Sequence, residues 1–361
     1  MGSDAELLKE KSPSLTDALD FRAAGRVRRL RARVYDRPDN DPFYAMKTLV
    51  AFVISLWVSG AVLVHAAPLR LSYSIVGPPV AGVWMTYETG AFKRYGLDVQ
   101  LVYIPSSVTN VQALLGGSLD VAVPGMSGVV LAVARGAQVT AIAATMNRPP
   151  MVLYTQPEIA RTEQLKGQTL GITRFNSTAH SVTMLMMRKL GLAQSVTIRP
   201  LGGGPEVQAA FEQKQIGGMV TSVRPRTPAN SLFNAANLEI PVAMNVFAAT
   251  QEFLQKNQQT VERVLRAYIE GVAAMNHDRD TALKVLAKYL KRNDPVFLDE
   301  MYNVSVQFTD RIPRVDPRTV ATVLEFEPVK GVDAETLAPK VIDNSLVDKL
   351  VNEGFISKLY R

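Results

Sequence analysis

Apolar and polar residues alternate along the chain from Leu69, and this period of two predicts a β-strand over residues 69–75. The strand breaks at Gly77-Pro78-Pro79, after which an apolar helix is predicted to run to about Arg94. The same order of elements continues, with strands predicted at 97–105, 119–124 and 138–145 and helices at 106–117 and 126–136. Strands that alternate with short helices predict a mostly parallel sheet covered by helices.

A second segment of the chain repeats this plan. Residues 168–192 match the order strand, loop, helix and Gly-Leu stop, in which Gly191-Leu192 corresponds to Gly96-Leu97. Residues 196–211 then predict a strand, a polar loop and a helix, and residues 217–222 predict another strand. Two consecutive α/β halves of this kind predict two lobes.

The final third of the chain has no strand pattern. An apolar stripe over residues 261–272 has the spacing of a helix. Further helices with aspartates at their starts are predicted at 279–290, 294–308 and 316–326. We expect these helices to pack on one lobe rather than to form a third domain.

A targeting segment precedes the first predicted strand. Residues 46–66 contain Lys47, an apolar stretch and the small-residue pattern Val64-His65-Ala66, which predict an export signal peptide. A retained membrane anchor is the alternative, although the apolar run is shorter than the ~20 residues of a spanning helix. Residues 1–45 are rich in arginine and have no core pattern, so they are predicted to be a disordered leader or to lie upstream of the true start.

Composition excludes several classes of function. The net charge of +7 is spread along the chain, which fits either an anionic ligand or general solubility. It argues against a nucleic-acid partner, because nucleic-acid binding requires basic residues clustered on one face. The chain has no cysteine, so disulfides, thiolate metal sites and a cysteine nucleophile are excluded.

The loops after the predicted strands are the candidate binding site. Open parallel sheets bind ligands beyond the carboxyl ends of their strands. These loops are rich in Gly, Ser, Thr and Asn and lead into helix N-termini or lie beside them, and the free N–H groups of helix N-termini favour anions and polar groups. Ordinary helix capping by Ser106, Ser127 and Ser177 is the alternative. Six such loops in two matching halves predict a cleft between the lobes: 75–79, 105–108, 124–127, 173–178, 201–205 and 221–224.

Motifs for catalysis do not occur in the sequence. The only histidines are His65, His180 and His277, and there is no G-x-S-x-G or H-E-x-x-H pattern. The three glycines at 202–204 lack the Lys-Ser/Thr of a phosphate loop. The sequence therefore predicts no catalytic residue, metal site or cofactor, and it leaves Glu206 and Arg174 as charged candidates near the cleft.

Four blocks of sequence resemble one protein family in the same order. Residues 81–123 ("AGVWMTYETGAFKRYGLDVQLVYIPSSVTNVQALLGGSLDVAV") resemble the start of periplasmic substrate-binding proteins of ABC importers. The group concerned is the nitrate/sulfonate/taurine and thiamine-pyrimidine-precursor type. Later blocks at 165–192, 201–211 and 264–290 resemble the same group, so that the resemblance covers residues 69–326.

The resemblance implies an α/β chain with the type II periplasmic-binding fold, in which two hinged lobes close on a ligand. Lobe 1 would comprise residues 67–154 plus 241–361, with the C-terminal helices packed on it, and lobe 2 would comprise residues 155–240. The residues that match the family's ligand-binding loops are Gly77, Pro78, Ser106, Gly125, Ser127, Arg174, Ser177, Thr178, Gly203, Gly204 and Ser222.

The segment over residues 217–230 departs from the family's pattern. Gly217 stands where the family has an acidic residue, and Arg224 lies near the expected proline, where it is a candidate charge partner for the ligand. The resemblance implies a monomeric periplasmic receptor that delivers a small solute to an ABC permease in the inner membrane. An enzyme on the same fold, of the pyrimidine-precursor or menaquinone-pathway type, is the alternative.

Overall fold

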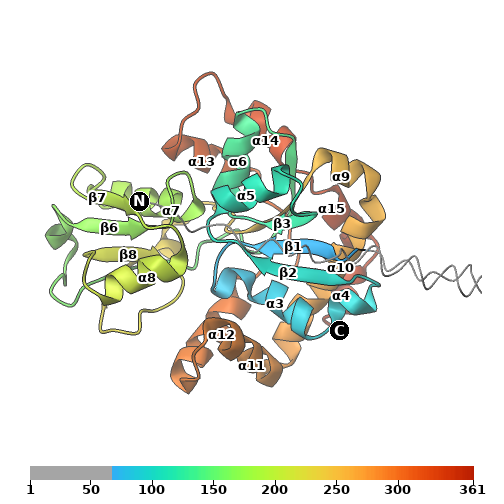
Figure 1. Cartoon of the computed structure of the whole chain (residues 1–361), viewed down its shortest axis with the longest axis horizontal. Helices are drawn as coiled ribbons and strands as arrows, with labels where there is room; N and C mark the ends of the chain where they lie inside the picture. Colours follow the sequence, from blue (N-terminus) through green and yellow to red (C-terminus); the bar gives the residue numbers. More distant parts are fainter. Residues whose placement is uncertain (1–66) are drawn as a thin grey trace, which may run out of the picture. The chain divides into compact units, whose positions relative to one another are not determined.

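Two five-stranded sheets organise residues 67–361, the part of the chain that the computed structural model describes (Figure 1). The predicted leader over 1–45 and the predicted export signal over 46–66 lie outside the described residues. The first sheet contains β1 (Leu69–Tyr73), β2 (Val99–Tyr103), β3 (Val121–Val123), β4 (Val139–Ala144) and β10 (Val246–Thr250). The second contains β5 (Val152–Thr155), β6 (Thr169–Ile172), β7 (Thr197–Pro200), β8 (Gly218–Thr221) and β9 (Asn230–Asn234).

Each sheet mixes parallel and antiparallel pairs. The strand orders are β2-β1-β3-β10-β4 and β7-β6-β8-β5-β9. The predicted strands β1, β2 and β3 pair in parallel, as do β6, β7 and β8. The sequence patterns missed β5, β9 and β10, and these three strands make the antiparallel pairs. The second sheet therefore begins at Val152, three residues before the predicted boundary at residue 155.

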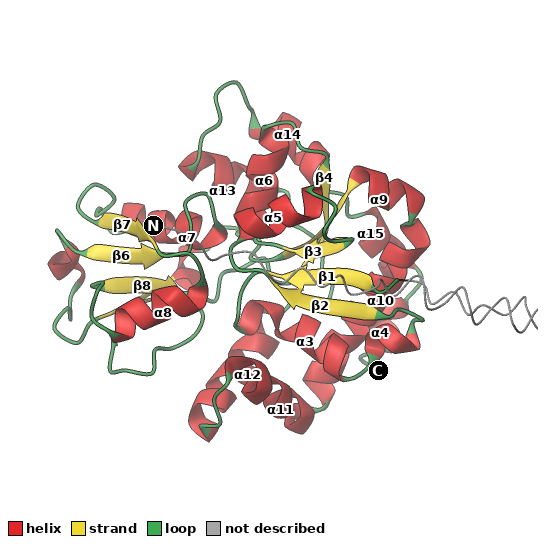
Figure 2. Ribbon diagram, in the orientation of Figure 1, coloured by secondary structure: helices red, strands yellow, loops and turns green. Residues whose placement is uncertain are grey.

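Helices cover both faces of each sheet (Figure 2). The helices of the first lobe's N-terminal part are α3 (Ala81–Glu88), α4 (Ala91–Arg94), α5 (Ser107–Leu115) and α6 (Met126–Ala134). Lobe 2 has α7 (Thr178–Lys189) and α8 (Gly204–Glu212). The C-terminal helices are α9 (Gln251–Lys256), α10 (Gln258–His277), α11 (Arg279–Leu290), α12 (Pro295–Phe308), α13 (Arg318–Phe326), α14 (Ala334–Val341), α15 (Ser345–Asn352) and α16 (Phe355–Lys358). Short 3₁₀ turns cover Pro78–Val80, Thr162–Leu165 and Ala235–Leu238.

The single helix predicted from the prolines to Arg94 is wrong in one respect, because it is divided into α3 and α4. Gly90 lies between them with φ 71°, in the left-handed region that glycine adopts without steric cost. The capping predictions for two C-terminal helices are confirmed. Asp278 accepts a hydrogen bond from Thr281 N at 3.0 Å, and Asp294 accepts one from Phe297 N at 2.6 Å.

The C-terminal helices pack mainly on the first sheet, as predicted. One face of this sheet is buried under α3, α10 and α11, and the other under α5, α6, α13 and α14. In lobe 2, α7 covers one face of the second sheet and α8 covers the other. Phe308 at the end of α12 and Phe326 at the end of α13 also join the core of lobe 2, so two C-terminal helices contact both lobes. None of the helices in residues 67–361 combines the length and the apolar character needed to cross a membrane.

Two chain segments cross between the sheets and bond to each other. The first follows β4, and the second leads into β10. Thr145 N donates to Asn245 O at 2.8 Å, Met244 N donates to Met146 O at 2.8 Å, and Val242 N donates to Asn147 O at 3.1 Å. This pairing holds the two crossovers together as one ribbon. Hinge motion between lobes takes place in short connecting segments of this kind.

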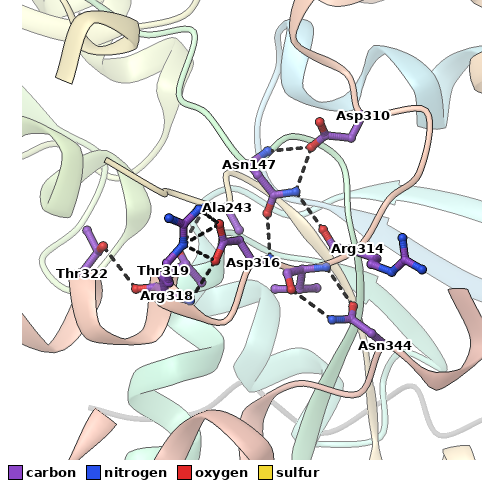
Figure 3. Close-up of polar contacts among 10 residues, drawn as sticks. Asn147, Ala243, Asp310, Arg314, Asp316, Arg318, Thr319, Thr322 and Asn344 are labelled. Atoms are coloured by element: carbon purple, nitrogen blue, oxygen red, sulfur yellow. Dashed lines mark hydrogen bonds and ion pairs between the residues drawn. The ribbon is translucent and has the colours of Figure 1, made fainter. Parts of the chain in front are cut away.

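Asn147 fixes the crossover ribbon to the segment before α13 (Figure 3). Its Nδ2 donates to Asp310 Oδ2 at 2.8 Å and to Arg314 O at 2.7 Å, and its Oδ1 accepts from Asp316 N at 3.0 Å. The Asn147 backbone N–H also donates to Asp310 Oδ2 at 2.9 Å. On the second crossover, Ala243 N donates to Thr319 Oγ1 at 3.0 Å.

We expect Asn147→Ala to lower the free energy of unfolding by roughly 2–4 kcal/mol, because it removes three side-chain hydrogen bonds, one of them to a carboxylate. Urea denaturation measures this change. Thr322→Val is the control, since the Thr322 hydroxyl makes only a long 3.4 Å bond to Arg318 O in the same region. Equal stability of the two variants would contradict the role of Asn147.

Candidate functional site

The six loops predicted from the sequence meet in three pairs, each pair joining one loop of lobe 1 to one of lobe 2. The loop after β1 meets the loop after β8, the loop after β2 meets the loop after β7, and the loop after β3 meets the loop after β6. The strand ends of the two sheets therefore face each other, as the sequence predicted. Figure 1 shows these ends between the two sheets.

Glycines allow two of these pairs to approach closely. A Cβ atom placed on Gly77 would lie 2.8 Å from Ser222 Oγ and 3.1 Å from Val223 Cγ2. A Cβ atom on Gly203 would lie 3.0 Å from Pro105 Cβ. Gly77 has φ 160°, which is extended backbone, so the close approach and not the backbone angle explains the glycine. Pro78 follows it as a buried residue that opens the 3₁₀ turn. The segment between β1 and α3, residues 74–80, contains no charged side chain, because it is packed against lobe 2.

The third pair is joined by hydrogen bonds. Ser127 Oγ lies 2.9 Å from Ser181 Oγ, and Ser127 N donates to Thr178 Oγ1 at 3.3 Å. A Cβ atom on Gly125 would overlap Thr178 Oγ1 and would lie 3.0 Å from Thr178 Cβ. Ser127 is the second residue of α6, whose N-cap is Gly125, so the alternative that Ser127 serves only as a helix cap is wrong.

Ser106 and three other hydroxyls at or near the strand-end loops are buried without a partner. The oxygens of Tyr103, Ser106, Ser107 and Ser222 have no hydrogen-bond partner among the described residues. Ser106 has φ 70° and ψ 135°, a conformation that is rare outside glycine, and its side chain does not cap α5. The capping alternative is therefore wrong for Ser106 as well. A buried hydroxyl without a partner costs about 1–3 kcal/mol, so these four groups favour a bound polar partner.

Tyr103 adds an uncharged donor at the end of β2. Burial and the nearby Glu206 carboxylate of lobe 2 raise the pKa of Tyr103 to about 12. The phenol therefore keeps its proton at neutral pH. It can donate to an acceptor on a solute or accept from a donor.

Of the remaining predicted site residues, Ser177 is buried, whereas Arg174, Gly204 and Arg224 are exposed. Ser177 caps α7, since its Oγ accepts from His180 N at 3.3 Å, and the capping alternative is confirmed there. The side chain of Arg174 is exposed, and a Cβ atom on Gly204 would meet no atom within 4 Å. Arg224 lies 3.7 Å from Glu300 of α12, so its charge is directed at lobe 1.

Glu327 is a buried acidic residue that the sequence did not single out. It follows α13, and its Oε1 lies 2.9 Å from His180 Nδ1 and accepts from Ser181 Oγ at 3.0 Å. His180 and Glu327 are 147 residues apart in sequence, and no local motif links them. The Glu-Pro pair at the end of a predicted helix was the only signal in the sequence.

The sequence predicted a cleft between the lobes, whereas the facing loops are in contact, as in a closed arrangement of the two lobes. A groove of about 850 Å³ lies elsewhere, on lobe 1 between the end of α6, α9 and the end of α14. Within residues 67–361, no group of three or more His, Asp or Glu residues is placed to hold a metal ion.

Comparison with known proteins gives one family and one fold. The sequence profile described as "NMT1/THI5 like" matches residues 78–282, more than half of the chain. No curated protein sequence matches the chain significantly.

Three solved structures illustrate the similarity of fold. The ligand-binding component of an ABC-type import system from Staphylococcus aureus has a TM-score of 0.65 at 14% identity, covering 79% of this chain and 99% of that one. The nitrate-binding protein NrtA from Synechocystis PCC 6803 has a TM-score of 0.63 at 13% identity, with coverage of 80% and 89%. The alkanesulfonate-binding protein SsuA from Xanthomonas axonopodis pv. citri has a TM-score of 0.60 at 17% identity, with coverage of 79% and 97%. The predicted periplasmic-binding fold is confirmed.

Proposed function

Because this chain belongs to the NMT1/THI5-like family, we propose that it is a solute-binding receptor of an ABC importer. It captures a small organic or anionic solute between its two lobes and delivers the solute to a permease. The proposal extends to this chain the roles carried in the names of the nitrate-binding and alkanesulfonate-binding structures with the same fold.

The observation that carries this proposal is the meeting of three pairs of loops across the lobes, with unpartnered buried hydroxyls among them. A ligand that bonds to both lobes stabilises the closed state in proportion to its extra contacts there. Ser106 and Ser107 on lobe 1 and Ser222 on lobe 2 are suited to this role, because each could gain a hydrogen bond from the solute.

The chemistry of these loops favours a small polar or oxyanionic solute. The N-termini of α5, α7 and α8 all lie at the junction of the lobes, and helix N-termini favour negative charge. Sulfonate, nitrate, taurine and pyrimidine-type solutes all fit a site made of hydroxyl and amide groups. Gly77, Pro78, Gly125, Gly203 and Gly204 would bring backbone groups close to the solute.

The proposal also covers the location and the partners of the protein. A receptor of this kind acts in the periplasm as a monomer, and its macromolecular partner is the permease in the inner membrane. The segment at 46–66, with its single lysine, apolar stretch and small-residue end, supports export.

An enzyme on the same fold is the second candidate, and the His180–Glu327 pair is the observation in its favour. A histidine held by a carboxylate is the core of many acid–base sites. However, the neighbouring Ser181 hydroxyl donates to Glu327, and so the arrangement is not that of a serine nucleophile activated by histidine. The receptor is therefore the better supported function.

A thermal-shift screen tests the receptor proposal. The purified protein is heated with nitrate, an alkanesulfonate, taurine or an aminopyrimidine. A solute present at 100 times its dissociation constant stabilises the folded state by about 2.7 kcal/mol, so the melting temperature should rise by several degrees. Formation of a new product from any of these compounds would instead support the enzyme.

A further inference from the structure

Glu327 belongs to an element of lobe 1 but contacts an element of lobe 2. Helix α13 packs into the core of lobe 1 through Val320 and Val323. Helix α7, which carries His180 and Ser181, packs on the second sheet. The contacts of Glu327 with His180 and Ser181 therefore cross between the lobes, and they are lost if α7 moves away from α13.

Two neighbours of Glu327 extend this contact along α7. Glu325 Oε1 lies 3.1 Å from Arg188 Nη2, and the guanidinium of Arg188 lies 4.8 Å from the centre of the Phe326 ring. His180 and Arg188 are eight residues apart, so they lie on one face of the helix. Residues 325–327, which we name the clasp, thus contact α7 over two turns.

Ser181 connects the clasp to the candidate binding loops. Ser181 Oγ donates to Glu327 Oε1 and also lies 2.9 Å from Ser127 Oγ of lobe 1. Ser177 and Thr178 precede Ser181 in the same first turn of α7. The hydrogen bond between Ser181 and Glu327 therefore also restrains Thr178, the residue that faces Gly125.

Glu327 is buried, so water screens its polar contacts less than it screens those of an exposed ion pair. Its side chain is only 6% exposed, whereas the side chains of the Arg188–Glu325 pair are 49% and 54% exposed. A carboxylate at the C-terminal end of α13 is opposed by that helix's dipole and favoured by the N-terminal end of α7. Glu327 Oε2 has no partner among the described residues, and this desolvated oxygen offsets part of the gain at Oε1. The contacts at Oε1 and the desolvation of Oε2 therefore act on closure in opposite directions.

We propose that Glu327 is a positioning residue for solute binding: it holds the first turn of α7 against lobe 1 and so slows the opening of the lobes. The consequence for binding rests on the receptor function proposed above, whereas the effect on opening does not. The proposal assigns Glu327 no direct contact with the solute.

Comparison of Glu327→Ala with Glu325→Ala tests this role, because the second variant removes an exposed ion pair from the same segment. Without added solute, amide exchange of residues 177–182 should become roughly 10-fold faster in Glu327→Ala and change little in Glu325→Ala. Small-angle scattering should show a larger radius of gyration for Glu327→Ala. Glu327→Gln keeps an acceptor oxygen and should recover part of the slow exchange.

Binding kinetics then separate this role from the receptor function. For any solute that binds in the thermal screen, Glu327→Ala should raise the dissociation rate by roughly 10-fold and leave the association rate unchanged. If no solute binds but exchange at 177–182 still rises, the receptor function fails and the positioning role stands. Exchange that is equal in the two alanine variants, or that rises evenly over both lobes, would overturn the positioning role.

Discussion

Gly125→Val is expected to weaken solute binding by roughly 100-fold or more while both lobes stay folded. A Cβ atom at this position would overlap Thr178 Oγ1 and would lie 3.0 Å from Thr178 Cβ, across the junction of the lobes. Gly125 has φ −69° and ψ 143°, which any residue can adopt, so the substitution introduces no backbone strain. The nearest atom to the added side chain belongs to the opposite lobe, so we expect the steric cost to fall mainly on closure of the lobes.

The expected result has two readouts. Titration with whichever solute raises the melting temperature gives the affinity, and small-angle scattering gives the fraction of open molecules without any solute. Gly125→Ala should show the same changes to a smaller degree, because it adds one carbon in place of three.

A compensating change controls for damage to lobe 1. A Cβ atom on Gly125 would also lie 3.1 Å from Ser107 Cβ, which belongs to the same lobe. Adding Thr178→Gly to Gly125→Ala removes the steric conflict across the lobes together with the Ser127 N–Thr178 Oγ1 hydrogen bond, so it should restore part of the closure as judged by scattering. If the double variant stays as open as Gly125→Ala, the steric conflict lies within lobe 1, and contact with Thr178 is not what requires a glycine at position 125.

Local pattern was sufficient to predict the six loops that meet at the junction. Each predicted loop follows a predicted strand, and five of the six lead toward a helix or a 3₁₀ turn, whereas the loop over 221–224 is followed by β9. The pattern could not predict which loop meets which, because that depends on the crossovers between the lobes. The crossover ribbon is held by Asn147 and Asp310, 163 residues apart in sequence.

The features that the sequence did not reveal depend on long-range packing. Strand β9 (Asn230–Asn234) is polar and mostly half-buried or exposed, so its residues have no apolar alternation, and only pairing with β5 makes it a strand. Glu327 is an ordinary glutamate in the sequence and becomes distinctive only when α7 covers it. The unpartnered hydroxyl of Ser222 likewise gains its meaning from Gly77 of the opposite lobe.

Replacing both Ser127 and Ser181 with cysteine is expected to lock the lobes together through a disulfide. The two hydroxyl oxygens are 2.9 Å apart, and a disulfide requires its sulfurs to be about 2.05 Å apart, so a small adjustment suffices. The chain has no cysteine of its own, so no other disulfide can form within it. The link would close a loop between positions 54 residues apart and stabilise the folded state by about 4 kcal/mol, which corresponds to a rise in melting temperature of roughly 10 °C.

The double cysteine variant measures closure directly, because the bond can form only when α6 and α7 are together. Oxidation in the presence of a bound solute should be faster than without it, and the oxidised protein should retain that solute through dialysis. Dithiothreitol should reverse both effects, and each single cysteine variant should show neither. Failure of the monomer to form this bond, with or without solute, would mean that the two strand-end loops do not close on each other, and a receptor that works by closure would then lose its physical basis.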